Sequence, residues 1–206
     1  GIDGSLGRFL QTGKFERWGY FPIDSFGVGR RLTGMSADTI RAYRRTLAYG
    51  LFGAQVLEET LGRRVDWLPH GMNLDVFTPR DRKASRMTLG VHSEEPVIGC
   101  VMTNQARKDW GLAFATVARL RQTYPNLTFW AHVDVLQRYW DLRALAEDFK
   151  LVENTVVTLS ATRSDTDLSY YYSACDVTML PSLGEGYGYP VVESMACGTP
   201  CVTGSY

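Results

Sequence analysis

Short runs of β-branched and aromatic residues alternate with longer amphipathic segments from about residue 40 onward. The run at 96–102 (PVIGCVM) predicts a buried strand. The segment 109–122 follows it and predicts a helix, because apolar residues recur at Trp110, Phe114, Val117 and Leu120. Strands that alternate with helices in this way are typical of an α/β fold. We therefore predict a doubly wound parallel sheet with helices on both faces.

The remaining elements extend this pattern and suggest the domain boundaries. Further strands are predicted at 65–68, 127–133, 155–159, 176–180 and 200–203, and further helices at 139–150, 166–174 and 189–196. Residues 1–65 are less regular, with a helix predicted at 37–45 and a strand followed by a helix within 46–61. These are too few strands for a complete domain. We predict a partial N-terminal Rossmann-like domain at 1–69, a linker at 70–80 and a C-terminal domain at 81–206 that is truncated at its end.

The charge balance and the cysteines narrow the class of protein. The chain has 22 Lys plus Arg and 22 Asp plus Glu, which argues against a nucleic-acid binder, because such proteins need a basic excess. Its four cysteines lie in apolar or small-residue stretches without a CxxC pair, so we expect reduced core residues and a cytoplasmic location. No apolar run approaches the roughly 18 residues of a membrane span, and no signal peptide is recognisable.

The segment 180–201 (LPSLGEGYGYPVVESMACGTPC) carries the most information about a site. It follows a predicted strand, and ligands bind at the carboxyl ends of strands in such sheets. Gly184, Gly186 and Gly188 are expected to adopt positive φ angles and to let the backbone approach a ligand. Pro190 suits a first helical turn and Gly198 suits a helix end.

A helix that begins near Tyr189 would direct its amide groups and positive dipole end towards a diphosphate. Glu185 and Glu193 would then flank the helix start, where two carboxylates can accept hydrogen bonds from the vicinal diols of a sugar and a ribose. The alternative is a glycine-rich turn in which Glu193 only complements the helix dipole. Since position 191 is Val, the segment lacks the G-x-G-x-x-G spacing of a nicotinamide site.

Residues 185–193 (EGYGYPVVE) resemble the E-x7-E signature of the retaining GT-B glycosyltransferases, the family of glycogen synthases, sucrose synthases and many mannosyltransferases. The flanking stretches 176–182 (DVTMLPS) and 194–200 (SMACGTP) are similar to that family as well. Residues 67–79 (WLPHGMNLDVFTP) resemble its interdomain linker. The resemblance implies a fold of the GT-B type, in which the C-terminal domain binds the donor.

The resemblance also implies roles for individual residues. Glu185 would contact hydroxyls of the donor sugar, and Glu193 would bind the nucleotide ribose. Backbone amides of the segment formed by Gly186, Tyr187, Gly188 and Tyr189 would hold the sugar or the diphosphate.

Two cations follow the predicted strand 96–102. Arg107 and Lys108 stand where positive charge can neutralise a leaving diphosphate. Members of the family often carry an Arg and a Lys several residues apart in this loop. Here they are adjacent, so which of them contacts which phosphate stays open, and so does the simpler reading of two solvated charges before a helix.

Two further motifs have competing interpretations. His132 ends a strand beside Asp134 and either faces the donor or serves a structural role. The triplet 165–167 (DTD) has the form of a D-x-D metal motif, but Ser164 precedes a predicted helix and Asp167 can complete a capping box with it. We favour the capping box and predict no metal site.

These residues together predict a retaining, metal-independent hexosyltransferase without a cofactor. Its donor would be a UDP- or GDP-sugar, with the base bound near 132–135 and 160–163. The acceptor, whether glycan, lipid or protein, stays open, as does peripheral membrane association through the rest of the N-terminal domain. The alternative is a catalytically inactive nucleotide-sugar-binding module. An epimerase or phosphorylase of the same fold would show a different glutamate and histidine set or a cofactor lysine, and neither pattern is recognisable.

Overall fold

The computed structural model describes residues 16–91, 94–159 and 164–204. The chain divides into two compact units. One comprises Gly1–Gly71 together with Gly184–Tyr187, and the other comprises Met72–Leu183 together with Gly188–Tyr206. The division after Gly71 falls within the segment 70–80 that the sequence suggests as a linker.

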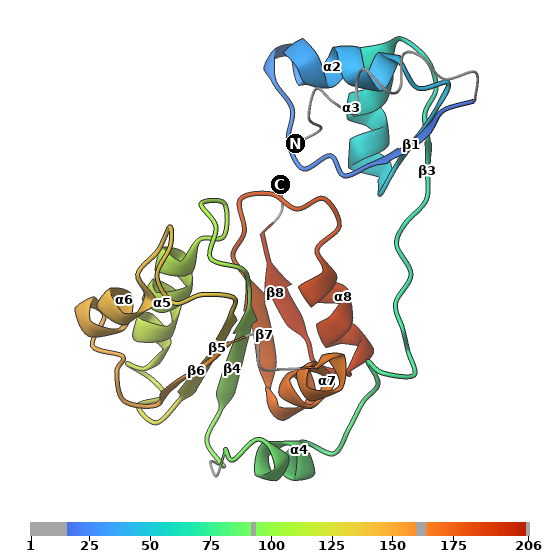
Figure 1. Cartoon of the computed structure of the whole chain (residues 1–206). Coiled ribbons are helices and arrows are strands. Elements are labelled where there is room, and N and C mark those ends of the chain that lie inside the picture. Colours follow the sequence, from blue (N-terminus) through green and yellow to red (C-terminus); the bar gives the residue numbers. More distant parts are fainter. Residues whose placement is uncertain (1–15, 92–93, 160–163, 205–206) are drawn as a thin grey trace. The chain divides into compact units, whose positions relative to one another are not determined.

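The C-terminal unit is built on a five-stranded parallel sheet (Figure 1). The strand order is β6 (Thr155–Leu159), β5 (Thr128–Val133), β4 (Val97–Val101), β7 (Val177–Leu180) and β8 (Cys201–Thr203). Strands β4 and β5 are paired from Val97 opposite Thr128 to Val101 opposite His132. All five strands lie within two residues of the predicted ranges, and the parallel sheet is confirmed.

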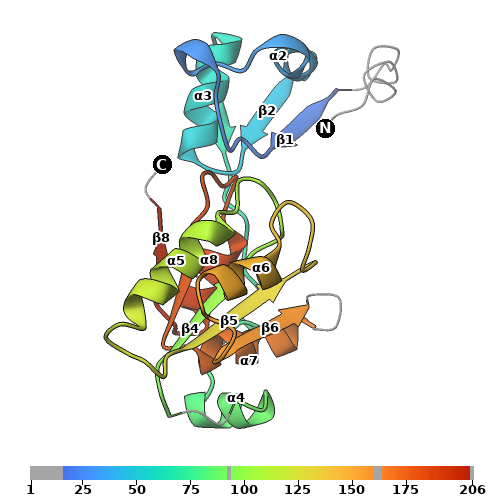
Figure 2. The ribbon, with the colours of Figure 1, turned by 90° about the vertical axis from the view of Figure 1, so that its left-hand side faces the viewer.

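Helices cover both faces of this sheet (Figures 1 and 2). Helices α5 (Trp110–Leu120) and α6 (Leu142–Asp148) lie on one face, and α7 (Asp165–Ala174) lies on the other. Helix α8 (Tyr189–Ala196) packs beside β7 and β8. Helix α4 (Arg82–Thr88) packs against α7 and was not among the predicted elements.

The core explains why the sheet is doubly wound. Alternate residues of a strand point to opposite faces, so Ile98 and Cys100 pack with Phe114 of α5, whereas Val97 packs with Tyr172 of α7. All six residues of β5 are buried. A strand buried on both faces is rich in apolar residues, and the apolar run identified β5 although it also includes the buried polar residues Thr128 and His132.

The N-terminal unit contains a smaller parallel sheet. Its order is β1 (Trp18–Phe21), β2 (Arg45–Ala48) and β3 (Asp66–Trp67), with helices α2 (Gly34–Arg41) and α3 (Leu51–Leu61) and a 3-10 turn, η1 (Val28–Arg30). Its core includes Phe21, Ile40, Ala48 and Leu57. The predicted helix 37–45 starts and ends earlier than expected, because Arg45 already belongs to β2.

All four cysteines are unpaired, as expected. Cys100, Cys175 and Cys197 are buried and Cys201 is half-buried. Burial raises the pKa of the Cys197 thiol to about 11, so this side chain stays protonated at neutral pH. Within the described residues, no helix is long and apolar enough to span a bilayer.

Candidate functional site

The segment between β7 and α8 differs in one respect from the sequence-based expectation. Gly188 has φ 81° and precedes the first residue of α8, but Gly184 and Gly186 do not adopt positive φ, so that prediction was wrong for two of the three glycines. Their backbone instead meets close neighbours within the N-terminal unit. A Cβ on Gly184 would stand 2.8 Å from the carbonyl oxygen of Asp24, and one on Gly186 would stand 3.2 Å from Cβ of Pro22.

Helix α8 begins and ends as its sequence predicts. Pro190 lies in the first turn, where its missing amide hydrogen costs nothing. Gly198 follows the last turn with φ 76°, a conformation that favours glycine. No side chain caps the amino end of α8.

Buried hydroxyl groups fix the orientation of α8 about its own axis. The Ser194 side chain is fully buried, and its Oγ lies 2.6 Å from Oγ1 of Thr178 on β7. Ser194 Oγ also donates to the carbonyl oxygen of Thr199 at 2.9 Å. Thr199 Oγ1 in turn donates to the carbonyl oxygen of Tyr172 at 2.8 Å. Because Ser194 is held in this way, the preceding residue, Glu193, has a defined direction.

Glu193 points towards α7. The hydroxyl of Tyr172 donates a 2.6 Å hydrogen bond to Oε2 of Glu193. Burial raises the pKa of Glu193, the nearby Asp165 also raises it, and the hydrogen bond from Tyr172 opposes both. No local sequence pattern predicts this contact, because the two residues lie 21 positions apart on different helices.

The loop that carries Arg107 and Lys108 lies against the segment that follows β7. Lys108 forms an isolated antiparallel bridge with Ser182, and the amide of Leu183 donates to the carbonyl oxygen of Arg107 at 2.8 Å. The Arg107 guanidinium donates to Oγ of Ser182 at 3.4 Å. Lys108 is only 5% exposed. Both cations therefore lie at the carboxyl edge of the sheet, next to the residues that lead into the E-x7-E segment.

Asn104 organises the same edge and was missed by sequence reasoning. It is fully buried, and its side-chain amide donates to the carbonyl oxygens of Val135 and Trp140 at 3.0 and 2.8 Å. Its Oδ1 accepts from the amide of Trp140 at 2.9 Å. Its own amide donates to the Asp134 carboxylate at 2.6 Å. Asn104 thus ties the loop after β4 to the loop after β5, and only these long-range contacts reveal it.

His132 is held inside the C-terminal unit. Its Nδ1 lies 2.9 Å from Oγ1 of Thr158, and its ring lies 5.7 Å from the ring of Tyr171 on α7. It is 6% exposed and lines a cavity of only about 10 Å³ with Thr158 and Tyr171. These contacts fit the structural reading of His132, and its role in donor binding stays a prediction.

The D-x-D triplet begins helix α7. Ser164 Oγ accepts from the Asp167 amide at 3.2 Å, and the Asp167 carboxylate accepts from the Ser164 amide at 2.9 Å. This is the predicted capping box. Among the described residues, no group of three or more His, Cys, Asp or Glu side chains is arranged to hold a metal ion.

The first half of the E-x7-E segment groups with the N-terminal unit. Glu185 and Gly186 are half-buried there. The Tyr187 hydroxyl donates to the carbonyl oxygen of His70 at 2.6 Å. Tyr189, the first residue of α8, is 40% exposed. The sugar and diphosphate roles of Glu185, Gly186, Tyr187, Gly188 and Tyr189 stay predictions.

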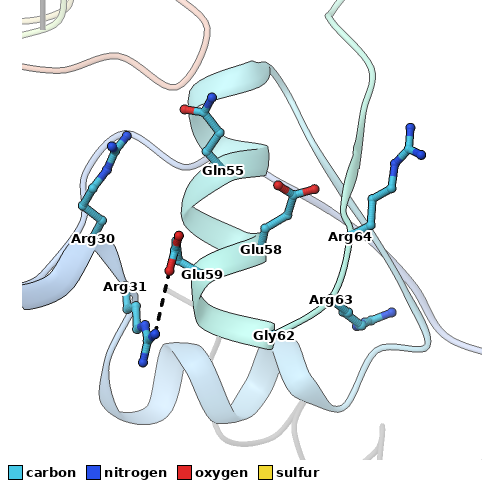
Figure 3. Close-up of a pocket in the computed structure, with 8 residues that line it drawn as sticks. All are labelled: Arg30, Arg31, Gln55, Glu58, Glu59, Gly62, Arg63 and Arg64. Atoms are coloured by element: carbon cyan, nitrogen blue, oxygen red, sulfur yellow. Dashed lines mark ion pairs between the residues drawn. The ribbon is translucent and has the colours of Figure 1, made fainter.

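The N-terminal unit carries a separate charged surface pocket (Figure 3). Its lining comprises Arg30, Arg31, Gln55, Glu58, Glu59, Gly62, Arg63 and Arg64. Most of these charges serve the fold. Arg31 pairs with Glu59 at 3.7 Å, Glu58 accepts from the amide of Val65 at 3.0 Å, and Arg63 donates to the carbonyl oxygens of Arg44 and Tyr43 at 2.8 and 2.9 Å. We therefore assign no ligand to this pocket.

Comparison with known proteins supplies the family. Residues 95–206, more than half of the chain, match the family model described as glycosyl transferases group 1. The chain belongs to this family. A D-inositol 3-phosphate glycosyltransferase of Mycobacterium marinum is 33% identical over 139 residues, which cover 68% of this chain and 29% of that protein. The chain thus spans about three tenths of the length of the curated relatives it matches.

Solved structures show the fold of this group 1 family member. The sucrose-phosphate synthase of Thermosynechococcus elongatus superposes with a TM-score of 0.74 at 20% identity, over 95% of this chain and 52% of that one. The HepE protein of Anabaena, solved in complex with UDP and glucose, gives a TM-score of 0.69 at 21% identity, over 82% of this chain and 46% of that one. The α/β fold of the GT-B type is thereby confirmed.

Proposed function

We propose that this chain forms the donor-binding part of a retaining glycosyltransferase that moves a sugar from a nucleoside-diphosphate sugar to an acceptor hydroxyl. One observation carries the proposal. Within the C-terminal unit, the loop with Arg107 and Lys108 is bonded to Ser182 and Leu183, directly before the E-x7-E segment whose helix presents Glu193. Membership of the glycosyl transferases group 1 family supports sugar transfer as the reaction.

The proposed chemistry is electrostatic. The bond between the anomeric carbon and the diphosphate oxygen breaks, and negative charge develops on the leaving diphosphate. Arg107, Lys108 and the backbone amides at the start of α8 stabilise that charge, which is the largest single contribution in many enzymes. The acceptor hydroxyl attacks the oxocarbenium-like sugar from the face that the diphosphate leaves and passes its proton to an oxygen of the leaving diphosphate, so the anomeric configuration is retained. We propose that the cations and the helix dipole replace a metal ion.

The donor roles follow from the resemblance of the motif. Glu185 is proposed to bind sugar hydroxyls and Glu193 the ribose, with the base bound near 132–135 and 160–163, of which 160–163 lies outside the described residues. We propose UDP- or GDP-sugars as donors. HepE was solved with UDP and glucose, which makes UDP-glucose the first compound to try. The name of the mycobacterial relatives adds D-inositol 3-phosphate to the acceptors worth testing.

The test of this function is a transfer assay on the purified chain. UDP-glucose and GDP-mannose are supplied with a panel of acceptors that includes D-inositol 3-phosphate, with and without EDTA. We expect a glycoside whose one-bond carbon–hydrogen coupling at the anomeric carbon matches that of the donor, at a rate that EDTA leaves unchanged. An inverted product would contradict the retaining mechanism, and loss of activity in EDTA would contradict metal independence.

A catalytically inactive nucleotide-sugar-binding module is the second candidate. Calorimetric binding of a nucleoside diphosphate without any sugar release or transfer in the same tubes would select this candidate.

A further inference from the structure

Tyr172 on α7 is a fully buried tyrosine whose hydroxyl meets a carboxylate. Its side chain is 0% exposed, and Oη donates to Oε2 of Glu193 at 2.6 Å. The ring packs against Phe77 and Tyr171, with centroids 6.3 and 5.8 Å away. Thr199 Oγ1 bonds the Tyr172 carbonyl oxygen. A buried ring with two rotatable bonds keeps its hydroxyl in one place.

We propose that Tyr172 is a positioning residue for ribose recognition, holding Oε2 of Glu193 so that Oε1 accepts hydrogen bonds from the ribose hydroxyls of a nucleoside diphosphate. This inference rests on the proposed function, which assigns the ribose to Glu193. Tyr172 thereby joins the proposed donor site from a different helix. The binding that depends on Tyr172 is that of the ribose hydroxyls, not that of the phosphates.

The hydrogen bond supplies direction. Ser194 fixes the rotation of α8 through Thr178 and Thr199. The glutamate side chain still has three rotatable bonds of its own, and Tyr172 restrains its far end. A carboxylate that is already oriented loses less conformational entropy when a ligand binds.

The hydrogen bond also favours the charged form of Glu193. The groups that act on this carboxylate are Tyr172 and Asp165, both on α7, and Cys197 lies near it directly after the end of α8. Burial and Asp165 raise the pKa of Glu193, and the Tyr172 hydroxyl lowers it. A carboxylate accepts stronger hydrogen bonds than a carboxylic acid. Loss of the hydroxyl therefore weakens ribose binding through both orientation and charge.

Tyr171 provides the matched control. It neighbours Tyr172, is 3% exposed, and its hydroxyl also lies in the core. That hydroxyl accepts from the amide of Cys100 at 2.9 Å and donates to the carbonyl oxygen of Trp130. Tyr171→Phe thus removes a buried hydroxyl from the same helix without touching the Glu193 carboxylate.

The experiment measures ribose selectivity by calorimetry. The whole chain, Tyr172→Phe, Tyr171→Phe and Glu193→Gln are titrated with UDP, GDP and ADP and with the 2′-deoxy and 3′-deoxy form of each. We expect Tyr172→Phe to weaken binding of the preferred ribonucleotide about tenfold or more, because the ribose hydroxyls bond to the charged Glu193 carboxylate. One deoxy form should already bind poorly to the wild type, and its affinity should change much less in Tyr172→Phe. The preference for the ribonucleotide over this deoxy form should therefore fall. Tyr171→Phe should keep the wild-type selectivity.

Two results would overturn the positioning role while the proposed function stands. One is unchanged selectivity in Tyr172→Phe, and the other is an equal loss for ribose and deoxyribose forms, which would indicate a general loss of packing. A folded wild-type chain that binds no nucleoside diphosphate would overturn the proposed function itself. An NMR titration of the Glu193 carboxyl carbon checks the charge effect without ligand. A higher pKa in Tyr172→Phe supports it, and an unchanged pKa contradicts it.

Discussion

The two edges of the sheet in the C-terminal unit carry the same kinds of charged residue in different surroundings. At the amino edge, the carboxylate of Asp176 accepts from Arg82 at 2.7 Å, from Arg86 at 2.8 Å and from the amide of Val97 at 2.8 Å. At the carboxyl edge, Arg107 and Lys108 lie beside Ser182, and the helix that starts there, α8, carries Glu193, which accepts from the neutral hydroxyl of Tyr172. The two carboxylates differ in the charge of their bonding partners. The Asp176 carboxylate, bonded to two guanidinium groups, holds the fold, whereas we propose that the Glu193 carboxylate, oriented by a neutral hydroxyl, is left to bind a ligand.

The largest expected effect comes from removing a cation at the carboxyl edge of the sheet. Arg107→Ala should lower turnover about 100- to 1000-fold, because it removes one cation from the proposed leaving diphosphate. Its effect on the free energy of unfolding should be within about 1 kcal/mol, since its side chain is half-buried and its hydrogen bond to Oγ of Ser182 is long, at 3.4 Å. Transfer rates measure the turnover, and thermal unfolding measures the stability. The control is Arg82→Ala at the amino edge, which should leave turnover unchanged. Equal losses of turnover in the two variants would contradict the division of roles.

The next largest effect comes from removing the carboxylate at the amino edge of the sheet. Asp176→Ala should lower the free energy of unfolding by about 2–4 kcal/mol, because it leaves the buried Arg86 without its carboxylate. The expected loss of stability is smaller than for a fully buried ion pair, since the Asp176 side chain is 34% exposed. Urea unfolding gives the stability, and calorimetry gives the nucleotide affinity of the folded fraction. A loss of affinity in that fraction would show that the two edges are not independent.

The affinity for the donor should depend on pH through the protonation of Glu193. Since burial raises the pKa of Glu193, the charged form is lost at a higher pH than for an ordinary glutamate. Nucleotide affinity should therefore be full above that raised pKa and fall as the pH drops through it, by up to about tenfold per pH unit. The stability effect has the opposite sign. Folding favours the protonated carboxyl, so this contribution to stability is lost as the pH rises from the ordinary value through the raised one. Titrations at several pH values, compared with Glu193→Gln, measure the first effect. A profile that Glu193→Gln leaves unchanged would contradict it.

The smallest expected effect concerns the start of α8. Gly188→Ala should cost about 1–2 kcal/mol of stability, because an L-residue with a side chain is strained at φ 81°. Gly71→Ala is the comparison, since Gly71 has no positive φ and an added Cβ there would meet no atom within 4 Å. Chemical unfolding of both variants measures the difference. If Gly71→Ala loses as much stability as Gly188→Ala, strain at Gly188 is not the cause.

Local sequence patterns predicted most of the C-terminal unit. The buried strands were found because adjacent residues such as Phe129 and Trp130, which pack on opposite faces of the sheet, are both apolar. The ends of α7 and α8 were found because Ser164, Asp167, Pro190 and Gly198 each satisfy a local backbone requirement. Helix α4 was missed, since it is short and depends on Arg86 reaching residues about 90 positions away.

The site could be predicted only in part, for a related reason. The E-x7-E segment identified Glu185 and Glu193 as candidates, but no local pattern indicates that Tyr172 contacts Glu193 or that Asn104 ties two loops together. Both contacts arise from the arrangement of strands and helices, which brings distant segments side by side. The positive φ expected at Gly184 and Gly186 was wrong because a glycine also serves close packing, and the sequence alone does not separate the two uses.

The most direct test of the account is the nucleotide affinity of Glu193→Gln. This variant keeps the size of the side chain and removes its charge, and Glu147→Gln on the exposed face of α6 provides the control. A ribonucleoside diphosphate should bind the wild type and the control equally and bind Glu193→Gln at least about tenfold more weakly. Equal affinity of Glu193→Gln and the wild type would contradict the claim that Glu193 belongs to the donor site.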